Sequence, residues 1–234
     1  MKASVEEIRR RFDQEVDRFA NLETGQSTAV DSPLMLELVT QAAAATNPDA
    51  RSVLDVGCGA GNYTLKLLEA LPGLDVTLVD LSRPMLDRAT ERLGPVARSI
   101  TAIQADIRDL DLGEARFDII LAATVLHHLR ADEEWEAVFE AFHRALRPGG
   151  SLWIVDLIEH SIPSVQSLMW QRYGAYLEGQ GGAELRDRVF AYIEWEDSPR
   201  PLCYQLALLE RVGFASVDVL HKNSCFAAFG AVKR

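Results

Sequence analysis

Residues 52–61 read Ser-Val-Leu-Asp-Val-Gly-Cys-Gly-Ala-Gly, and this stretch decides the fold. Ser52–Asp55 has the apolar character of a short buried strand, and it is followed by Gly57, Gly59 and Gly61. Glycine permits positive φ and lets the backbone approach a ligand closely, while a helix that begins next offers free N–H groups. The stretch therefore predicts a strand, a ligand-binding turn and a helix over residues 62–70.

The same alternation of strand and helix continues along the chain. Helices are expected from Ser82, a good N-cap, and over about 132–146, and the further strands are 75–80, 100–105, 117–122 and 151–157. Buried strands that alternate with helices are typical of a parallel sheet covered on both faces. The fold class we predict is doubly wound α/β.

The end of the chain departs from this pattern. Residues 217–221 and 224–232 are both strand-like, and only Lys222-Asn223 separates them. A two-residue gap permits a hairpin but no crossover, so this pair is expected to be antiparallel. The sheet should then be mixed and seven-stranded.

Length and composition fit a single globular domain of 234 residues, 48% of them hydrophobic and 25% charged. We expect residues 1–45 to form an N-terminal helical lid and 46–157 to form the ligand-binding core. Residues 158–198 should be a substrate-side insertion, and 199–234 a final helix with the antiparallel strands.

The net charge and the cysteine content indicate which binding partners and which cellular compartment to expect. A net charge of −11 argues against direct nucleic-acid binding, because phosphate backbones attract basic surfaces. The N-terminus lacks the apolar core of a signal peptide, and no apolar run is long enough to span a membrane. Cys58, Cys203 and Cys225 form no disulfide or zinc pattern, so a reducing, cytoplasmic location is expected. A homodimer is compatible with the sequence, which does not fix the oligomeric state.

Acidic residues stand at the ends of three successive predicted strands: Asp55, Asp80 and Asp106. Open α/β sheets bind ligands at this carboxyl edge. A buried carboxylate at Asp55 would repel a pyrophosphate but would stabilise a cationic ligand that carries an ammonium and a sulfonium. Asp80, 25 residues later, is placed to accept hydrogen bonds from ribose hydroxyls.

Five segments over residues 52–157 together resemble the class I S-adenosylmethionine-dependent methyltransferases: VLDVGCGAG, LVDLSRPML, QADIRDL, FDIILAATVLHHL and LRPGGSLWIVD. The resemblance implies a Rossmann-like sheet and S-adenosyl-L-methionine as cofactor. It places the methionine part against the glycines, the ribose on Asp80, the adenine beside Asp106 and Ile107, and the sulfonium near residues 122–124. The cofactor-binding residues that it implies are Asp55, Gly57, Cys58, Gly59, Gly61, Asp80, Leu81, Met85, Asp106, Ile107, Ala122 and Ala123.

The resemblance also implies transfer of a methyl group to a small-molecule acceptor by in-line displacement at the sulfonium. His128, at the mouth of the predicted pocket, is the candidate catalytic residue, because an imidazole can take a proton from an acceptor hydroxyl or amine. Trp170, Tyr173 and Tyr176 either clasp the substrate or pack the insertion onto the sheet. No cluster of His, Cys and Asp has metal-ligand spacing along the sequence, so no metal is predicted.

Two alternatives remain open. The layout of the N-terminal helices and of the residues after 158 is similar to carboxy-S-adenosylmethionine synthase, an enzyme of tRNA wobble-uridine modification. That interpretation requires an arginine to bind a carboxylate, for which Arg186 and Arg188 are the candidates. The other alternative is a module that binds the cofactor and has no chemistry of its own.

Overall fold

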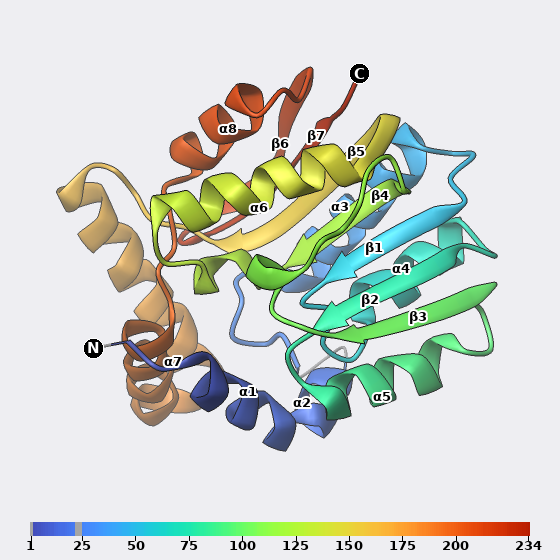
Figure 1. Cartoon of the computed structure of the whole chain (residues 1–234). Coiled ribbons are helices and arrows are strands. Elements are labelled where there is room, and N and C mark those ends of the chain that lie inside the picture. The colour runs from blue at the N-terminus through green and yellow to red at the C-terminus, as the bar shows by residue number, and fades with distance from the viewer. Residues whose placement is uncertain (1, 22–24) are drawn as a thin grey trace.

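The computed structural model describes residues 2–21 and 25–234, and its centre is a seven-stranded sheet with the order β3-β2-β1-β4-β5-β7-β6 (Figure 1). The strands are β1 (Ser52–Val56), β2 (Asp75–Asp80), β3 (Ser99–Gln104), β4 (Phe117–Ala123), β5 (Leu146–Leu157), β6 (Ser216–Asn223) and β7 (Phe226–Val232). Strands β1 to β5 pair in parallel, whereas β7 runs antiparallel to both β5 and β6. The predicted mixed, doubly wound sheet is confirmed.

The hairpin turn and the start of β5 differ most from the prediction, while the other strand boundaries agree with it to within one or two residues. The hairpin turn is formed by Ser224 and Cys225, not by Lys222-Asn223, and Ser224 adopts the positive φ of 49° that a tight two-residue turn requires. Strand β5 begins at Leu146 and not at 151, because Leu146 already pairs with Phe117. The register of that pairing shifts between Phe117 and Ile119, which accommodates the Pro-Gly-Gly segment inside the strand.

Helices cover both faces of the sheet. On one face lie α3 (Ser32–Thr46), α4 (Asn62–Ala70) and α5 (Arg83–Leu93), and on the other lie α6 (Asp132–Ala145) and α8 (Leu202–Arg211). The side chain of Ser82 accepts a hydrogen bond of 3.3 Å from the Met85 amide, which confirms it as the N-cap of α5. None of the helices in the described ranges combines the length and the hydropathy needed to cross a lipid bilayer.

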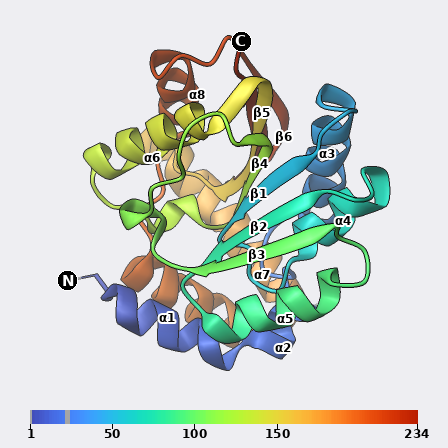
Figure 2. The ribbon, with the colours of Figure 1, turned by 45° about the vertical axis from the view of Figure 1, so that its right-hand side comes forward.

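The remaining helices gather at the carboxyl ends of the parallel strands, at the lower left of Figure 1. They are α1 (Val5–Gln14), α2 (Val16–Ala20) and the long α7 (Pro163–Glu196), which is kinked at Gly181 and Gly182. Figure 2 shows α1 and α2 side by side with α5 below the sheet, and both contact α5. Of the predicted lid over residues 1–45, only α1 and α2 take this place, since α3 packs against α4 and the strands β5 to β7.

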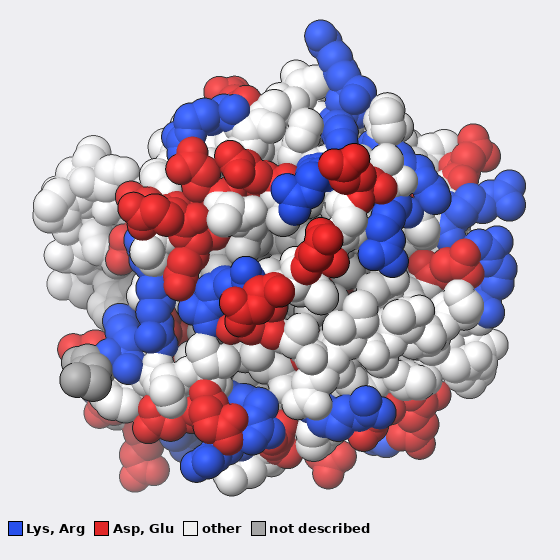
Figure 3. All heavy atoms as spheres, in the orientation of Figure 1, with Lys and Arg blue, Asp and Glu red and all other residues white. Residues whose placement is uncertain are grey.

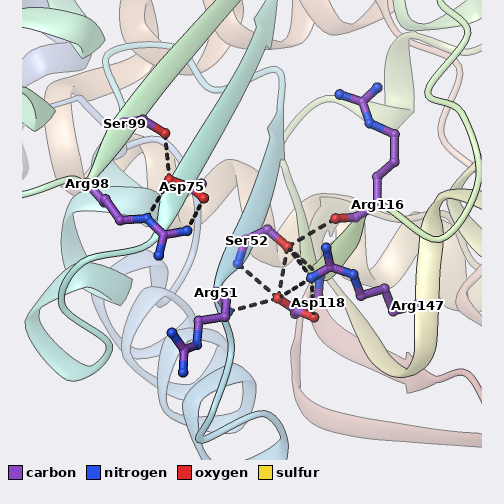
Figure 4. A network of polar contacts seen from close by, with 8 residues as sticks. All are labelled: Arg51, Ser52, Asp75, Arg98, Ser99, Arg116, Asp118 and Arg147. Atoms are coloured by element: carbon purple, nitrogen blue, oxygen red, sulfur yellow. Dashed lines mark hydrogen bonds and ion pairs between the residues drawn. The ribbon is translucent and has the colours of Figure 1, made fainter.

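The opposite, amino edge of the sheet is fixed by charged residues (Figure 4). The Asp118 carboxylate accepts hydrogen bonds from the backbone amides of Arg51 and Ser52, at 2.8 and 2.9 Å, and from the Arg147 guanidinium at 2.9 Å. These contacts join the start of β1 to β4 and β5. The polar groups at the amino edge thus satisfy one another's hydrogen bonds. The candidate ligand sites lie at the opposite, carboxyl edge.

A substitution at Gly230 tests the packing of β5 against β7. This glycine pairs with Trp153, and an added Cβ would lie 2.6 Å from the Leu152 carbonyl oxygen and against the Trp153 ring. We expect Gly230→Ala to lower the free energy of unfolding by about 1–3 kcal/mol, because the core would be overpacked. Urea denaturation measures this. Gly179→Ala is the control, since a Cβ there meets no atom within 4 Å and should not destabilise the helix.

Candidate functional site

A cavity at the carboxyl edge is lined by the glycine turn after β1 and by the end of β2; we call it the cofactor cavity. It encloses roughly 710 Å³ of empty space, part of it open to solvent. Gly57 and Gly59 line it with φ of 64° and 49°, in the left-handed region that glycine tolerates. A Cβ on Gly57 would lie 2.6 Å from the Cβ of Val125, whereas a Cβ on Gly59 would point into open space. The turn therefore presents bare backbone to this cavity.

Two carboxylates face the cofactor cavity from β1 and β2. Asp55 is buried and accepts a hydrogen bond of 2.6 Å from the Thr64 hydroxyl, and burial raises its pKa to about 7. Asp80 accepts from the amides of Gly59 and Ser82, both at 2.8 Å, and burial raises its pKa to about 6. A cationic ligand would favour the ionised form of both groups and would lower both pKa values.

A second hollow continues from this cavity toward β3, where Asp106 and Ile107 line it together with Val5 and Ile8 of α1. The Asp106 carboxylate accepts a hydrogen bond of 2.9 Å from Nε of Arg108. Burial works in the opposite direction, but the hydrogen bonds from Arg108 hold the pKa of Asp106 below its usual value. The carboxylate is thus ionised and retains lone pairs for a further donor, as the predicted adenine contact requires.

A further cavity lies beside the cofactor cavity, and we call it the acceptor cavity. It encloses roughly 630 Å³ of empty space, part of it open to solvent. Its walls combine aromatic rings with polar groups, among them Phe12, Phe19, Tyr173, Tyr192, Phe226, Arg11, Arg18, Thr124, His127, His128 and Asp197. Several residues line both cavities: Phe12, Phe19, Gln26, Thr124 and His128. The two cavities therefore share a wall, and His128 is part of it.

Polar contacts attach the lid helices α1 and α2 to other elements that surround these cavities. The Arg11 guanidinium binds the buried Glu196 carboxylate, with an Nε–Oε1 distance of 2.7 Å, and stacks over Phe12 and Tyr192. The Asn62 amide of the cofactor turn donates to the Phe19 carbonyl at 2.9 Å. Asn62 in turn accepts a hydrogen bond of 2.7 Å from Arg92. Helix α1 is thus tied to α7, and α2 is tied to the cofactor turn.

Two adjacent histidines, His127 and His128, line the acceptor cavity together with Asp197, and a further aspartate, Asp156, binds His127. Nδ1 of His127 binds the Asp156 carboxylate, whose other oxygen accepts from the His127 amide at 3.0 Å. Burial alone would lower the pKa of His127, but the charges of Asp156 and Asp197 raise it to about 9. Burial, reinforced by the charge of His127, lowers the pKa of His128 below its usual value.

Most of the predicted cofactor residues line the cofactor cavity or the hollow beside it. They are Asp55, Gly57, Cys58, Gly59, Asp80, Leu81, Met85, Asp106, Ile107 and Ala123. Gly61 instead adopts φ 79° at the start of α4 and lies close to Ala89 and Leu93 of α5, so it serves the packing of the two helices. Ala122 is fully buried in the core on the α6 side of the sheet, because successive strand residues point to opposite faces.

The predicted substrate-side residues Trp170, Tyr173 and Tyr176 have two different roles in the structure. Tyr173 lines the acceptor cavity, and its hydroxyl donates to the Thr28 carbonyl at 3.0 Å. Tyr176 fastens the segment before α3 through a hydrogen bond of 2.9 Å to the Ser27 carbonyl, and Trp170 stacks on Phe190. These two side chains therefore pack the insertion, which is the other interpretation that the sequence left open.

The predicted carboxylate-binding arginines line neither the cofactor cavity nor the acceptor cavity. Arg186 pairs with Glu178 and Asp187 on α7, and the side chain of Arg188 is exposed. Arg11 and Arg18 of the lid line the acceptor cavity instead. The sequence contains one sign that these two arginines face the site, namely the amphipathic pattern of the N-terminal helices. That pattern does not show which element a helix packs against.

Residues 53–150 match the family described as methyltransferase domain. A cypemycin N-terminal methyltransferase from a Streptomyces species is 35% identical over 79% of this chain and 70% of its own length. The chain belongs to the class I S-adenosylmethionine-dependent methyltransferases. A carboxy-S-adenosyl-L-methionine synthase from Shewanella woodyi is 26% identical to this methyltransferase, over 80% of this chain and 77% of the relative.

Solved structures share the fold of this methyltransferase. The magnesium protoporphyrin IX methyltransferase from Synechocystis, solved with S-adenosylhomocysteine bound, superposes with a TM-score of 0.67 at 16% identity and covers 99% of this chain and 100% of its own. Several other similar structures are longer, and the chain spans 56% to 66% of their length. The cofactor of this methyltransferase is S-adenosyl-L-methionine, in agreement with the prediction.

Replacement of Asp80 tests the ribose assignment. We expect Asp80→Ala to weaken S-adenosylmethionine binding by about 10- to 100-fold, since hydrogen bonds to a charged group contribute about 1.5–3 kcal/mol. Isothermal titration calorimetry measures the affinity. Asp87→Ala is the matched control. It removes an exposed carboxylate of α5 that pairs with Arg83 of that helix, and the variant should bind S-adenosylmethionine with normal affinity. Equal affinities of the two variants would contradict the assignment.

Proposed function

We propose that this methyltransferase transfers the methyl group of S-adenosylmethionine to a small, flat acceptor held in the acceptor cavity. The observation that supports this proposal is the wall shared by the two cavities, which includes Thr124 and His128. A sulfonium methyl bound on one side of such a wall would be within reach of a nucleophile bound on the other. His128 is the polar side chain that we expect to contact the reacting atoms.

In-line displacement at a sulfonium needs little covalent help from the protein. Correct positioning of two bound reactants can supply up to about 7–11 kcal/mol of the barrier reduction in favourable cases. Phe12 and Phe19 cover both cavities from the lid and would exclude water from the reaction. The chain's own contribution would be to hold the acceptor in line with the carbon–sulfur bond.

The lining of the acceptor cavity favours one class of acceptor. Rings from Phe12, Phe19, Tyr192 and Phe226 suit a flat, largely apolar molecule. The lining also includes the polar side chains of His127, His128 and Asp197, so we propose an acceptor whose nucleophile is a hydroxyl or an amine. Arg11 is already bound by Glu196, which makes it a poor receptor for a second carboxylate.

We further propose that the enzyme acts in the cytoplasm without a nucleic-acid partner. Free thiols at Cys58, Cys203 and Cys225 suit a reducing compartment. Lys and Arg are intermixed with Asp and Glu on the face shown in Figure 3, where no broad basic surface is seen. Phosphate backbones bind to basic surfaces, so this face is unsuited to them.

A second candidate function is conversion of the cofactor itself, as in carboxy-S-adenosylmethionine synthase. It is favoured by Arg18, which lines the acceptor cavity: one terminal nitrogen of its guanidinium pairs with Glu15 at 3.2 Å, but its buried Nε has no hydrogen-bond partner in the described part of the chain. A carboxylate-bearing co-substrate would need such a cation near the methyl group.

Mass spectrometry of the small molecule released from the purified enzyme distinguishes these functions. We expect S-adenosylmethionine or S-adenosylhomocysteine, and methyl transfer from labelled cofactor to one or more members of a panel of phenols and amines. The mass of a carboxylated derivative would instead support the second candidate. Cofactor binding without transfer to any member of the panel would contradict the proposed acceptor class and favour a binding module.

A further inference from the structure

We propose that His127, His128 and Asp197 bind a divalent transition-metal ion in the wall of the acceptor cavity, where it coordinates the hydroxyl oxygen of the acceptor. The binding of the metal stands on the geometry of these side chains alone. Its contact with an acceptor rests on the proposed function.

Three potential ligand atoms converge at this place. Oδ1 of Asp197 lies 3.1 Å from Nδ1 of His128 and 3.8 Å from Nε2 of His127, and one ligand atom from each of the three residues lies within 4.8 Å of the others. Nitrogen and oxygen ligands bind zinc at about 2.0–2.2 Å, so that neighbouring ligands of one ion are roughly 3–3.5 Å apart. The observed spacings require only small side-chain adjustments to hold one ion between the three atoms.

Two of these ligand atoms lack hydrogen bonds. Nδ1 of His128 and Oδ1 of Asp197 are buried, and neither makes a hydrogen bond with any residue in the described ranges. Their 3.1 Å approach to each other does not have hydrogen-bond geometry. An unsatisfied buried polar group costs about 1–3 kcal/mol, and Asp197 is only 3% exposed. A cation between the two atoms would satisfy both.

His127 is already oriented as a metal-ligating histidine. Its Nδ1 is engaged by the fully buried Asp156, so its Nε2 is the free nitrogen that points toward Asp197. Metal-ligating histidines almost always donate their other ring N–H to a carboxylate or carbonyl, which fixes the tautomer. Asp156 is itself fixed, because its oxygens also accept from the amides of His127 and Leu157.

The ligand set leaves positions open toward the acceptor. Two imidazoles and one carboxylate suit zinc or another first-row transition metal, and three protein ligands leave room for a water or a substrate oxygen. All three residues line the acceptor cavity, and His128 also lines the cofactor cavity. The open positions would thus lie on the side of the cofactor methyl group.

Coordination would prepare the acceptor for methyl transfer. A hydroxyl bound to the metal would have a lower pKa and would release its proton to the solvent, to which the acceptor cavity is partly open. The resulting oxygen attacks the methyl carbon, an oxygen–carbon bond forms, and the carbon–sulfur bond breaks with its electron pair moving to sulfur. The products are the methyl ether and S-adenosylhomocysteine. His128 then acts as a metal ligand and not as the proton acceptor that the sequence suggested.

Metal titration of the whole chain tests the proposal. Tag-free enzyme is stripped with a chelator, checked by elemental analysis, and titrated with Co²⁺ by visible absorption and with Zn²⁺ by calorimetry. We expect one equivalent of each to bind and a cobalt ligand-field band to appear. His127→Gln and Asp197→Asn should each weaken Zn²⁺ binding at least 100-fold and abolish the band, while the affinity for S-adenosylmethionine stays within threefold.

The matched control is His221→Gln, which breaks another histidine–aspartate pair, with 2.9 Å between Nε2 of His221 and Oδ2 of Asp31. That pair belongs to no cluster of three ligands found in the described residues, so the variant should bind metal normally. Asp156→Asn should weaken binding about 10- to 100-fold through the orientation of His127. Circular dichroism verifies that each variant is folded.

Wild-type enzyme that binds neither ion, or binding that Asp197→Asn and His127→Gln leave unchanged, would overturn the metal site. If metal binds but the stripped enzyme methylates its acceptor at the full rate, the coordination of the acceptor is overturned while methyl transfer stands. Failure of the proposed function is a separate result, because metal binding is measured without any acceptor.

Discussion

The burial of carboxylates at the carboxyl edge of a parallel sheet is the constraint on which the rest of this structure depends. Each such group must find donors, because an unpaired buried charge is expensive. Asp55 accepts a hydrogen bond from the Thr64 hydroxyl, and Asp80 accepts hydrogen bonds from two backbone amides. Asp156 binds Nδ1 of His127. The donors come from the turns and helices that follow the strands, so satisfaction of the charges also fixes the connections at this edge. Cofactor binding and folding thereby depend on the same contacts.

The helical additions convert this edge into an enclosed site. Helix α7 brings Tyr173, Tyr192 and Asp197 to one cavity, and its kink at Gly182, with φ 76°, lets two helical segments reach the sheet from different directions. Arg11 joins α1 to the end of α7 through Glu196. The proposed acceptor cavity is therefore lined largely by elements outside the sheet, as is usual where a rigid scaffold carries its recognition residues on its connections.

The sequence predicted what is encoded locally. The strand and turn from Ser52 to Gly61 and the N-cap at Ser82 depend on neighbouring residues, so pattern and spacing suffice for them. The approach of Asp197 to His128 could not be predicted, because 69 residues separate them and only the path of α7 brings them together. For the same reason, the spacing of residues along the chain could not show that Arg11 and Arg18 line the acceptor cavity while Arg186 and Arg188 do not. The position of α3 against β5 to β7 likewise depends on tertiary packing, which the periodicity of the sequence does not predict.

The hydrogen bond from Asn62 to the Phe19 carbonyl has a consequence for ligand exchange. Asn62 begins the helix after the cofactor turn, and Phe19 covers both cavities. A displacement of α2 that opens a path to either cavity must also break this bond and reshape the wall of the other. The cofactor and the proposed acceptor would thus enter and leave past the same helix, and the occupancy of each cavity would be coupled to the exchange of the ligand in the other.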